Sequence, residues 1–446
     1  MSMNSLSADP ARPVVPSPIG AWTPAWMIAF VALWPLPGLA EAVLVLGALF
    51  ACVRLLQARA RGGIAPLLSV EAWALTSALF AAYWLPQLVS AIDAVDPARA
   101  WAKAVAGLRY LPFLWLAAMA VATPSRRTRT FAGLAVVAGL WVVDGLVQAA
   151  LGTSPLFWSL EQLKWALQGR ELCAPEDMQV LDRLGGVFGL CNPKLGQVLA
   201  SLSPFLLFAA GRRFGRTGWL LAAATAGIVI VLAGSRASWL TYLLVLVFSG
   251  WRVLGGRGLL VVMALALAGA LALGVVSPQV RARVEQTAQA LQADGGGVDA
   301  ALSGRGRIWG AALCMFGEHP VNGVGARGFR EAYPACDPAP GEPGAWGEGP
   351  ALHAHQIVLE ILSETGAIGL LLWLAGTALA WRAWRYATAA AREQARPAMV
   401  ALAVTVFPIN THLAFYSTFW GGVTLLLAAL YAGALLGRTT EAQAAG

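Results

Sequence analysis

Apolar residues dominate the chain in long continuous runs, and short polar segments separate these runs. About twelve runs approach the roughly 20 residues that a helix needs to cross a bilayer. The runs are continuously apolar rather than alternating, which favours membrane helices over a β-barrel. We therefore expect an all-α integral membrane protein. The expected spans lie near residues 21–35, 39–56, 70–90, 104–122, 130–151, 193–211, 216–233, 236–251, 257–276, 355–381, 397–416 and 418–437.

Composition excludes an ordinary soluble protein. Of the 446 residues, 58% are hydrophobic and only 12% are charged, whereas soluble domains carry about 25% charged residues. The formal net charge of +8 comes mostly from arginines in short linkers. It therefore indicates orientation in a membrane and does not indicate a nucleic-acid partner.

Arginine-rich linkers follow every second expected span. Their arginines are Arg54, Arg59, Arg61, Arg126, Arg127, Arg129, Arg212, Arg213, Arg216, Arg252, Arg257, Arg382, Arg385, Arg392 and Arg396. The positive-inside rule makes their side cytoplasmic, together with both termini. We expect a disordered cytoplasmic leader over 1–20 without a cleaved signal peptide, spans 1–9 over 21–276, an outward loop over 277–354, spans 10–12 over 355–437, and a cytoplasmic tail over 438–446.

Two outward segments are longer than simple turns. In residues 152–192, the run SPLFWSLEQLKWALQ alternates large apolar and polar side chains, as an interfacial helix does. In residues 277–354, VRARVEQTAQALQ predicts one helix, and RGRIWGAALCMF predicts a second that Ser303 caps and Pro320 ends. The stretch HPVNGVGARGF is a glycine-rich turn, and CDPAPGEPGAWGEGP predicts a loop without regular structure.

Several cations on the outward side are candidate anion ligands. Arg236 begins an expected span, where the helix N-terminus adds partial positive charge. Arg305 and Arg307 begin a loop helix, where cations oppose the helix dipole unless an anion is bound. Arg183 and Lys194 flank GGVFGLCNP just before the sixth span. The alternatives are snorkelling of Arg236 at the interface, solvation of Arg305 and Arg307, and membrane anchoring by Arg183 and Lys194.

Two histidines lie where the long loop enters the tenth span. His353 and His355 are candidates for a general base or for a donor to an anion, and their spacing is a weak zinc signal without a third ligand. His319 and His412 are expected to be structural. The sequence Gly323 to Gly328 matches GxGxxG, but no strand precedes it, so we interpret it as a tight turn and not as a dinucleotide site.

Few ionisable groups are expected inside the bilayer. They are Arg109, Asp144, Glu360 and Glu364, and such groups are functional hypotheses by default. All four are expected in the outer half of their spans. This distribution disfavours a transporter, which needs polar groups at several depths.

These residues together resemble the O-antigen ligase and polymerase family between about Arg183 and Gly369. The matching pieces, in order, are R-x-x-G-x-F (Arg183, Gly186, Phe188), GSRxxW-L (Gly234, Ser235, Arg236, Leu240), G-R-x-x-I-W (Gly304, Arg305, Ile308, Trp309), HP-x-x-GVG-x-x-x-F (His319 to Phe329) and H-x-x-x-L-x-x-L-x-E-x-G-x-x-G (His355, Leu359, Leu362, Glu364, Gly366, Gly369). Two positions depart from the family pattern, Gln356 after the histidine and the CNPK segment that contains Lys194.

The resemblance implies a GT-C-like membrane glycosyltransferase at the periplasmic face of a bacterial inner membrane. Such enzymes take a glycan from undecaprenyl pyrophosphate, without a nucleotide sugar, metal or other cofactor. Arginine can neutralise a pyrophosphate leaving group through bidentate contacts, and the outward loops lack a DxD-like pair. The implied pyrophosphate ligands are Arg236, Arg305, Arg183, Arg307 and Lys194. His355 is the expected catalytic histidine, with His353, Glu364 and Arg109 as supporting residues.

Family members differ in their acceptor. Ligases use lipid A–core, polymerases use a second lipid-linked repeat, and others modify proteins and often carry a large extra C-terminal region. The length of this chain and its paired loop helices favour a ligase, with a polymerase as the alternative and a polyprenyl-glycan transporter as a less favoured one.

Five cysteines show no CxxC metal spacing. Cys173, Cys191 and Cys336 are expected on or near the periplasmic side, where disulfides are permitted. Cys173 is the most exposed expected partner for Cys336.

Overall fold

The computed structural model describes residues 22–61, 67–173, 183–276, 281, 285, 304–342, 344, 346, 349–411 and 414–438. Within these residues the regular structure is helical, which confirms the predicted all-α class. The helices are α1 (Thr23–Ala32), α2 (Pro37–Ala60), α3 (Val70–Ser90), α4 (Pro97–Gly107), α5 (Tyr110–Met119), α6 (Pro124–Leu151), α7 (Pro155–Gln168), the 3-10 turn η3 (Gly186–Phe188), α8 (Leu195–Leu232), α9 (Arg236–Val276), α12 (Arg305–Glu318), α13 (Phe329–Cys336), α14 (Ile357–Tyr386), α15 (Ala389–Thr405) and α16 (Thr418–Leu435).

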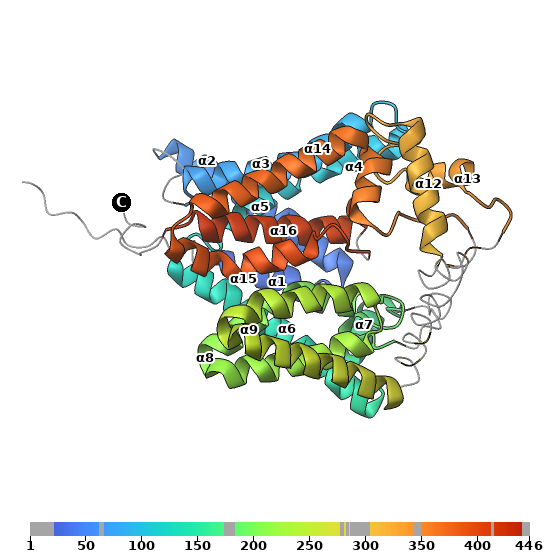
Figure 1. Ribbon diagram of the computed structural model, residues 1–446. Coiled ribbons are helices and arrows are strands. Elements are labelled where there is room, and N and C mark those ends of the chain that lie inside the picture. The colour runs from blue at the N-terminus through green and yellow to red at the C-terminus, as the bar shows by residue number, and fades with distance from the viewer. Residues whose placement is uncertain are drawn as a thin grey trace, which may run out of the picture.

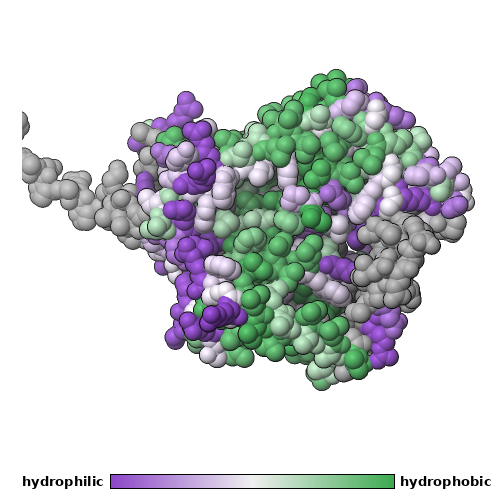
Figure 2. Space-filling view, viewed as in Figure 1, coloured by the Kyte–Doolittle hydropathy of each residue, from purple (hydrophilic) through white to green (hydrophobic). Residues whose placement is uncertain are grey.

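The long helices lie side by side as a bundle, and α12 and α13 cover one end of it (Figure 1). We call this end the α12 end. A broad hydrophobic band surrounds the bundle, and hydrophilic residues flank it on both sides (Figure 2). Among the described residues, α2, α6, α8, α9, α14 and α16 are long and apolar enough to cross a membrane. The protein is therefore a multi-pass membrane protein.

The six long helices do not correspond one to one with the twelve expected spans. Both α8 and α9 contain a non-helical residue, Gly215 and Gly255 respectively, and each is two helices joined at a kink. The expected span 104–122 is divided between α4 and α5. Helices α1 and α15 are shorter than a typical span. The count of twelve therefore remains a prediction.

Helix α14 is interrupted at its α12 end, and the glycine-rich turn fills the interruption. Gly366 has φ 63° and ψ −162°, which breaks the helix. The backbone amides of Ala367 and Ile368 donate to the carbonyls of Pro320 and Val321, at 2.9 and 3.1 Å. The amides of residues 324 and 325 donate in return to the carbonyls of residues 363 and 364, at 2.9 and 3.0 Å. Two segments with separate sequence motifs are thus partners in space.

Gly366→Ala is expected to loosen this junction. The φ and ψ of Gly366 lie in a region that essentially only glycine occupies, so backbone strain alone costs about 1–3 kcal/mol. A Cβ at this position would also come within 2.4 Å of the Val321 backbone. We expect a lower thermal unfolding temperature in detergent, together with reduced activity. Gly317→Ala on α12 is the control, since a Cβ there meets nothing within 4 Å and helix propensity improves. Equal unfolding temperatures for the two variants would contradict this account.

The loop region differs from expectation in two respects. Helix α12 begins and ends as predicted, but α13 was not predicted, because Pro334 and the flanking glycines masked its short amphipathic pattern. The expected cap Ser303 and most of the expected helix 280–292 lie outside the described residues. Helix α7 forms where the interfacial helix was predicted, and its Ser154 caps the helix by accepting from the Phe157 amide.

The predicted pairing of Cys173 with Cys336 is wrong. Cys173 bonds to Cys191, and Cys336 bonds to Cys314. In each pair the Cα atoms lie within the usual range for a disulfide, at 5.5 and 5.6 Å. The cause is local folding. The chain after α7 returns towards η3, and α13 packs on α12, so each cysteine meets a neighbour in its own segment.

Candidate functional site

Arg183 lies against the turn that connects α8 and α9. Gly234 in this turn has φ 69°, and a Cβ there would lie 3.1 Å from Cγ of Arg183. The Leu184 amide donates to the Leu232 carbonyl at 3.2 Å, which fixes the approach. Arg236 follows two residues after Gly234 and begins α9. The structure thus brings together two cations that are 53 positions apart in sequence.

Arg305 is the first residue of α12 and extends this cationic cluster. Its Nη1 donates to Oγ1 of Thr411 at 3.2 Å, in the connection between α15 and α16. Burial lowers the pKa of the Arg305 guanidinium, and the charge of Arg236 lowers it further. Among the described residues, no carboxylate forms a salt bridge with Arg305. A bound anion would therefore relieve repulsion between two neighbouring cations.

The loop that carries His355 is held from three sides. The Trp309 indole on α12 donates to the Ala354 carbonyl at 3.1 Å. Gln356 caps α14 by accepting from the Leu359 amide at 2.6 Å, and its Nε2 donates to the Pro408 carbonyl at 2.9 Å. His355 itself has φ 52°, a left-handed conformation that is uncommon outside glycine. Such strain persists only where surrounding contacts impose it, and it is frequent at functional sites.

His355 is set up as a neutral imidazole. Burial lowers the pKa of its side chain to about 4, and the charge of Arg305 contributes to the shift. Its Nδ1 is buried without a hydrogen-bond partner among the described residues. The ring of His353 lies on it, with ring centroids 3.8 Å apart. A neutral imidazole beside partly buried cations can accept a proton from a hydroxyl group.

Lys194 lies on a different element from the other cations. It is the N-cap residue of α8, and its Nζ lies 4.5 Å from the ring centroid of Phe419 on α16. This cation–π contact holds the ammonium at the N-terminal turn of α16. The structure therefore places Lys194 at the start of two helices, α8 and α16.

Two buried glutamates on α14 organise the loops around the site. Glu360 accepts from the Tyr416 amide at 3.2 Å, which anchors the connection that carries Thr411. Glu364 accepts from the Arg327 amide at 2.7 Å. Both side chains are fully buried, and each keeps one carboxylate oxygen without a partner among the described residues. Their hydrogen bonds join α14 to two of the surrounding loops.

Sequence reasoning overlooked two further cations, Arg327 and Lys103. Arg327 lies in the GxGxxG turn with φ 68°, and its Nη1 is buried without a partner in the described part of the chain. Lys103 on α4 donates to Oγ1 of Thr418 at 3.3 Å. Burial and, next, the charge of Arg327 lower the pKa of Lys103 to about 8. The sequence carried no local signal for Arg327, because the left-handed conformation that distinguishes it is visible only in the structure.

Arg307 and Arg109 are instead engaged by carboxylates. Arg307 forms two bonds of 2.6 Å to Asp337 and donates to the Ala339 carbonyl at 2.6 Å. These bonds raise its pKa and lower that of Asp337. Arg109 forms a 2.8 Å salt bridge with Glu41 on α2. The structure therefore gives Arg307 a structural role in the loop, because the carboxylate of Asp337 is the anion that pairs with it. From the sequence alone, the partner of Arg307 was unknown.

Arg307→Ala is expected to weaken the α12–α13 unit more than it weakens donor binding. A partly buried bidentate pair that loses one partner leaves an unpaired carboxylate, at a cost of about 1–3 kcal/mol. We expect a lower unfolding temperature with a nearly unchanged KM for the donor in the folded fraction. Asp337→Asn is the matched variant and should lower stability similarly. A large rise in donor KM for Arg307→Ala alone would contradict this role.

The two histidines that were expected to be structural are His319 and His412. His319 is the residue at which α12 ends, and its backbone amide donates to the Met315 carbonyl at 2.9 Å. His412 lies outside the described residues.

Taken together, the chain is a helical membrane protein with a cationic, histidine-containing site at its α12 end. Residues 199–374 match the family described as O-Antigen ligase, which confirms the resemblance that the motifs indicated. The matched segment includes Arg236, Arg305, His355 and Glu364, whereas Arg183 and Lys194 precede it. The family implies an enzyme related to glycosyl transfer, with lipid-linked glycans and lipid A–core as its general class of partners. No curated protein matches the chain.

Proposed function

We propose that this protein is an O-antigen ligase of the bacterial inner membrane. It transfers a polysaccharide from undecaprenyl pyrophosphate to lipid A–core at the periplasmic face. The observation that carries the proposal is a chain of neighbouring side chains from four separate segments. Arg183 lies against the turn before Arg236, Arg236 is near Arg305, and Arg305 is near His355. Arginines bind the two phosphates, and a neutral histidine lies beside them.

In the proposed reaction, a hydroxyl oxygen of the acceptor attacks the anomeric carbon of the donor glycan. His355 takes the hydroxyl proton as general base. The bond between the anomeric carbon and the pyrophosphate oxygen breaks, and undecaprenyl pyrophosphate leaves with the electron pair. Arg236 and Arg305 stabilise the charge that develops on it, with Arg183 beside them. No proposed step needs a metal or another cofactor.

A polymerase is the second candidate function. It would use the same donor and the same cations, with a lipid-linked glycan repeat as acceptor. A transporter is less favoured because the described ionisable cluster gathers at one end of the bundle, whereas transport needs polar groups at several depths.

A deletion strain separates these functions. Loss of a ligase should leave polymer on the lipid carrier and none on lipid A–core. Loss of a polymerase should leave single repeats on the core. Loss of a transporter should trap lipid-linked repeats on the cytoplasmic side. Complementation with the wild-type chain, and failure with a His355→Ala chain made in equal amount, ties the phenotype to the site.

The orientation is a separate prediction. Reporter fusions after Arg129, Arg213 and Arg392 should report the cytoplasm, because arginine-rich linkers are retained there. Fusions near Gly169 and Ala339 should report the periplasm. A cytoplasmic signal from the fusion at Ala339 would place the site on the wrong side for a periplasmic ligase.

A further inference from the structure

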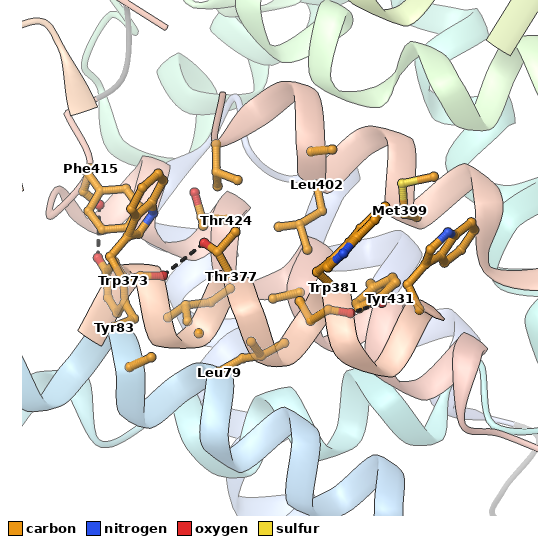
Figure 3. A pocket seen from close by; sticks show the side chains of 18 residues that line it. Leu79, Tyr83, Trp373, Thr377, Trp381, Met399, Leu402, Phe415, Thr424 and Tyr431 are labelled. Atoms are coloured by element: carbon orange, nitrogen blue, oxygen red, sulfur yellow. Dashed lines mark hydrogen bonds between the residues drawn. The ribbon is translucent and has the colours of Figure 1, made fainter. Parts of the chain in front are cut away.

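An apolar groove lies between α14 on one side and α15 and α16 on the other, with α3 at one edge (Figure 3). Its volume is about 210 Å³. Aromatic side chains of α14 form one wall, and Met399 and Leu402 on α15 face them (Figure 3). In the space-filling view, the hydrophobic band is recessed between α14 and α15 (Figure 2). The groove therefore lies at membrane depth.

The groove is long and narrow. It extends on α14 from Trp373 to Trp384, a rise of about 16 Å along the helix axis. Small residues, among them Gly376, Ala380 and Ala403, leave room between the aromatic side chains. The volume spread along this length is suited to one extended hydrocarbon chain rather than to the several acyl chains of a large lipid.

One end of the groove leads to the cationic cluster. Val406 and Phe415 line this end, and they flank the connection between α15 and α16. Within the same connection, Thr411 accepts from Arg305, and Pro408 accepts from Gln356 next to His355. The connection between α15 and α16 therefore closes this end of the groove and also holds Arg305, the candidate ligand for pyrophosphate. At the same end, Tyr83 on α3 donates to the Phe415 carbonyl at 3.0 Å and closes the α3 side.

We propose that this groove binds the polyisoprenoid chain of the glycan donor, an inference that rests on the proposed function. The donor has a long hydrocarbon chain attached to a charged pyrophosphate head. The apolar groove and the cationic cluster at its end match these two parts in the same order. Burial of each methylene contributes favourably to binding. The chain would enter sideways from the bilayer, and its head would reach Arg305 at the α12 end.

Occupancy can be tested without glycan transfer. The purified protein in phosphatidylethanolamine–phosphatidylglycerol nanodiscs is irradiated with a diazirine-bearing undecaprenyl phosphate, and adducts are mapped by mass spectrometry. We expect adducts on Trp381, Met399 and Leu402. Unlabelled undecaprenyl pyrophosphate should compete, whereas added phospholipid should not. Equal competition by phospholipid would mean bulk lipid in the groove and would overturn the proposal.

A matched pair of variants makes the test specific. Ala403→Trp fills the groove from an exposed position on α15, and Ala378→Trp adds the same bulk to an exposed position of α14 that does not line it. We expect Ala403→Trp to reduce labelling about tenfold, since displacing two or three methylenes suffices for this change. Ala378→Trp should label like the wild type. Equal labelling of both variants would exclude the groove.

The transfer assay then distinguishes the two lipid substrates. Ala403→Trp should raise the KM for the undecaprenyl-linked donor about tenfold and leave the KM for lipid A–core unchanged. A rise confined to the acceptor would assign the groove to an acyl chain of the acceptor and overturn the proposal. Absence of transfer by the wild-type protein would instead count against the proposed function, while the labelling result would still decide what the groove binds.

Discussion

Replacing Arg305 with alanine is expected to reduce glycan transfer by about 10²–10³-fold. Removal of one preorganised donor from a buried anion-stabilising site typically has an effect of this size. Arg305 is partly buried and next to Arg236, so the solvent screens its charge on a bound pyrophosphate less than it would at an exposed site. The loss should fall mainly on kcat/KM for the donor, measured with purified protein in nanodiscs.

Two further variants sharpen this test. Arg305→Lys keeps the charge and loses the bidentate geometry, so it should recover only part of the activity. Arg212→Ala removes an exposed arginine from the α8 kink and should transfer normally. Wild-type kcat/KM for Arg305→Ala would show that the cluster does not bind the leaving group.

His355→Ala is expected to reduce transfer by about 10²–10⁴-fold, the usual range for loss of a general base. His353→Ala should have a smaller effect, because its ring supports His355 through the stacking contact. An inactive His353 variant together with an active His355 variant would reverse these roles. Full activity of both variants would leave the chemistry to the arginines alone.

The pH dependence distinguishes two roles for His355. Its pKa is lowered to about 4 because burial and Arg305 disfavour the imidazolium form. The side chain is therefore neutral at pH 7. As a base, it loses activity when the pH falls through about 4, and it adds no inflection to kcat/KM between pH 5 and 8. A cationic ligand would show the opposite sign, with activity lost as the pH rises through about 4.

The contrast between Arg305 and Arg307 shows where sequence reasoning ended. Both begin the same helix, two residues apart, and spacing assigned them the same role. The structure separates them because Asp337, which follows α13, folds back to pair with Arg307. A salt bridge between segments distant in sequence leaves no local signal. The cysteine pairing failed for the same reason, since it depended on the packing of α13 on α12.

The sequence by itself determined the helical membrane class and the family resemblance, and it named most of the residues of the candidate site. These follow from local properties, namely the length of apolar runs and motifs whose residues lie close together in the chain. Tertiary structure alone decided that Arg183 lies against Gly234 and that residues 320–325 fill the break at Gly366. It also brought Arg327 close enough to Lys103 to lower its pKa. Each of these contacts joins segments far apart in the chain, and only packing of the helices brings such segments together.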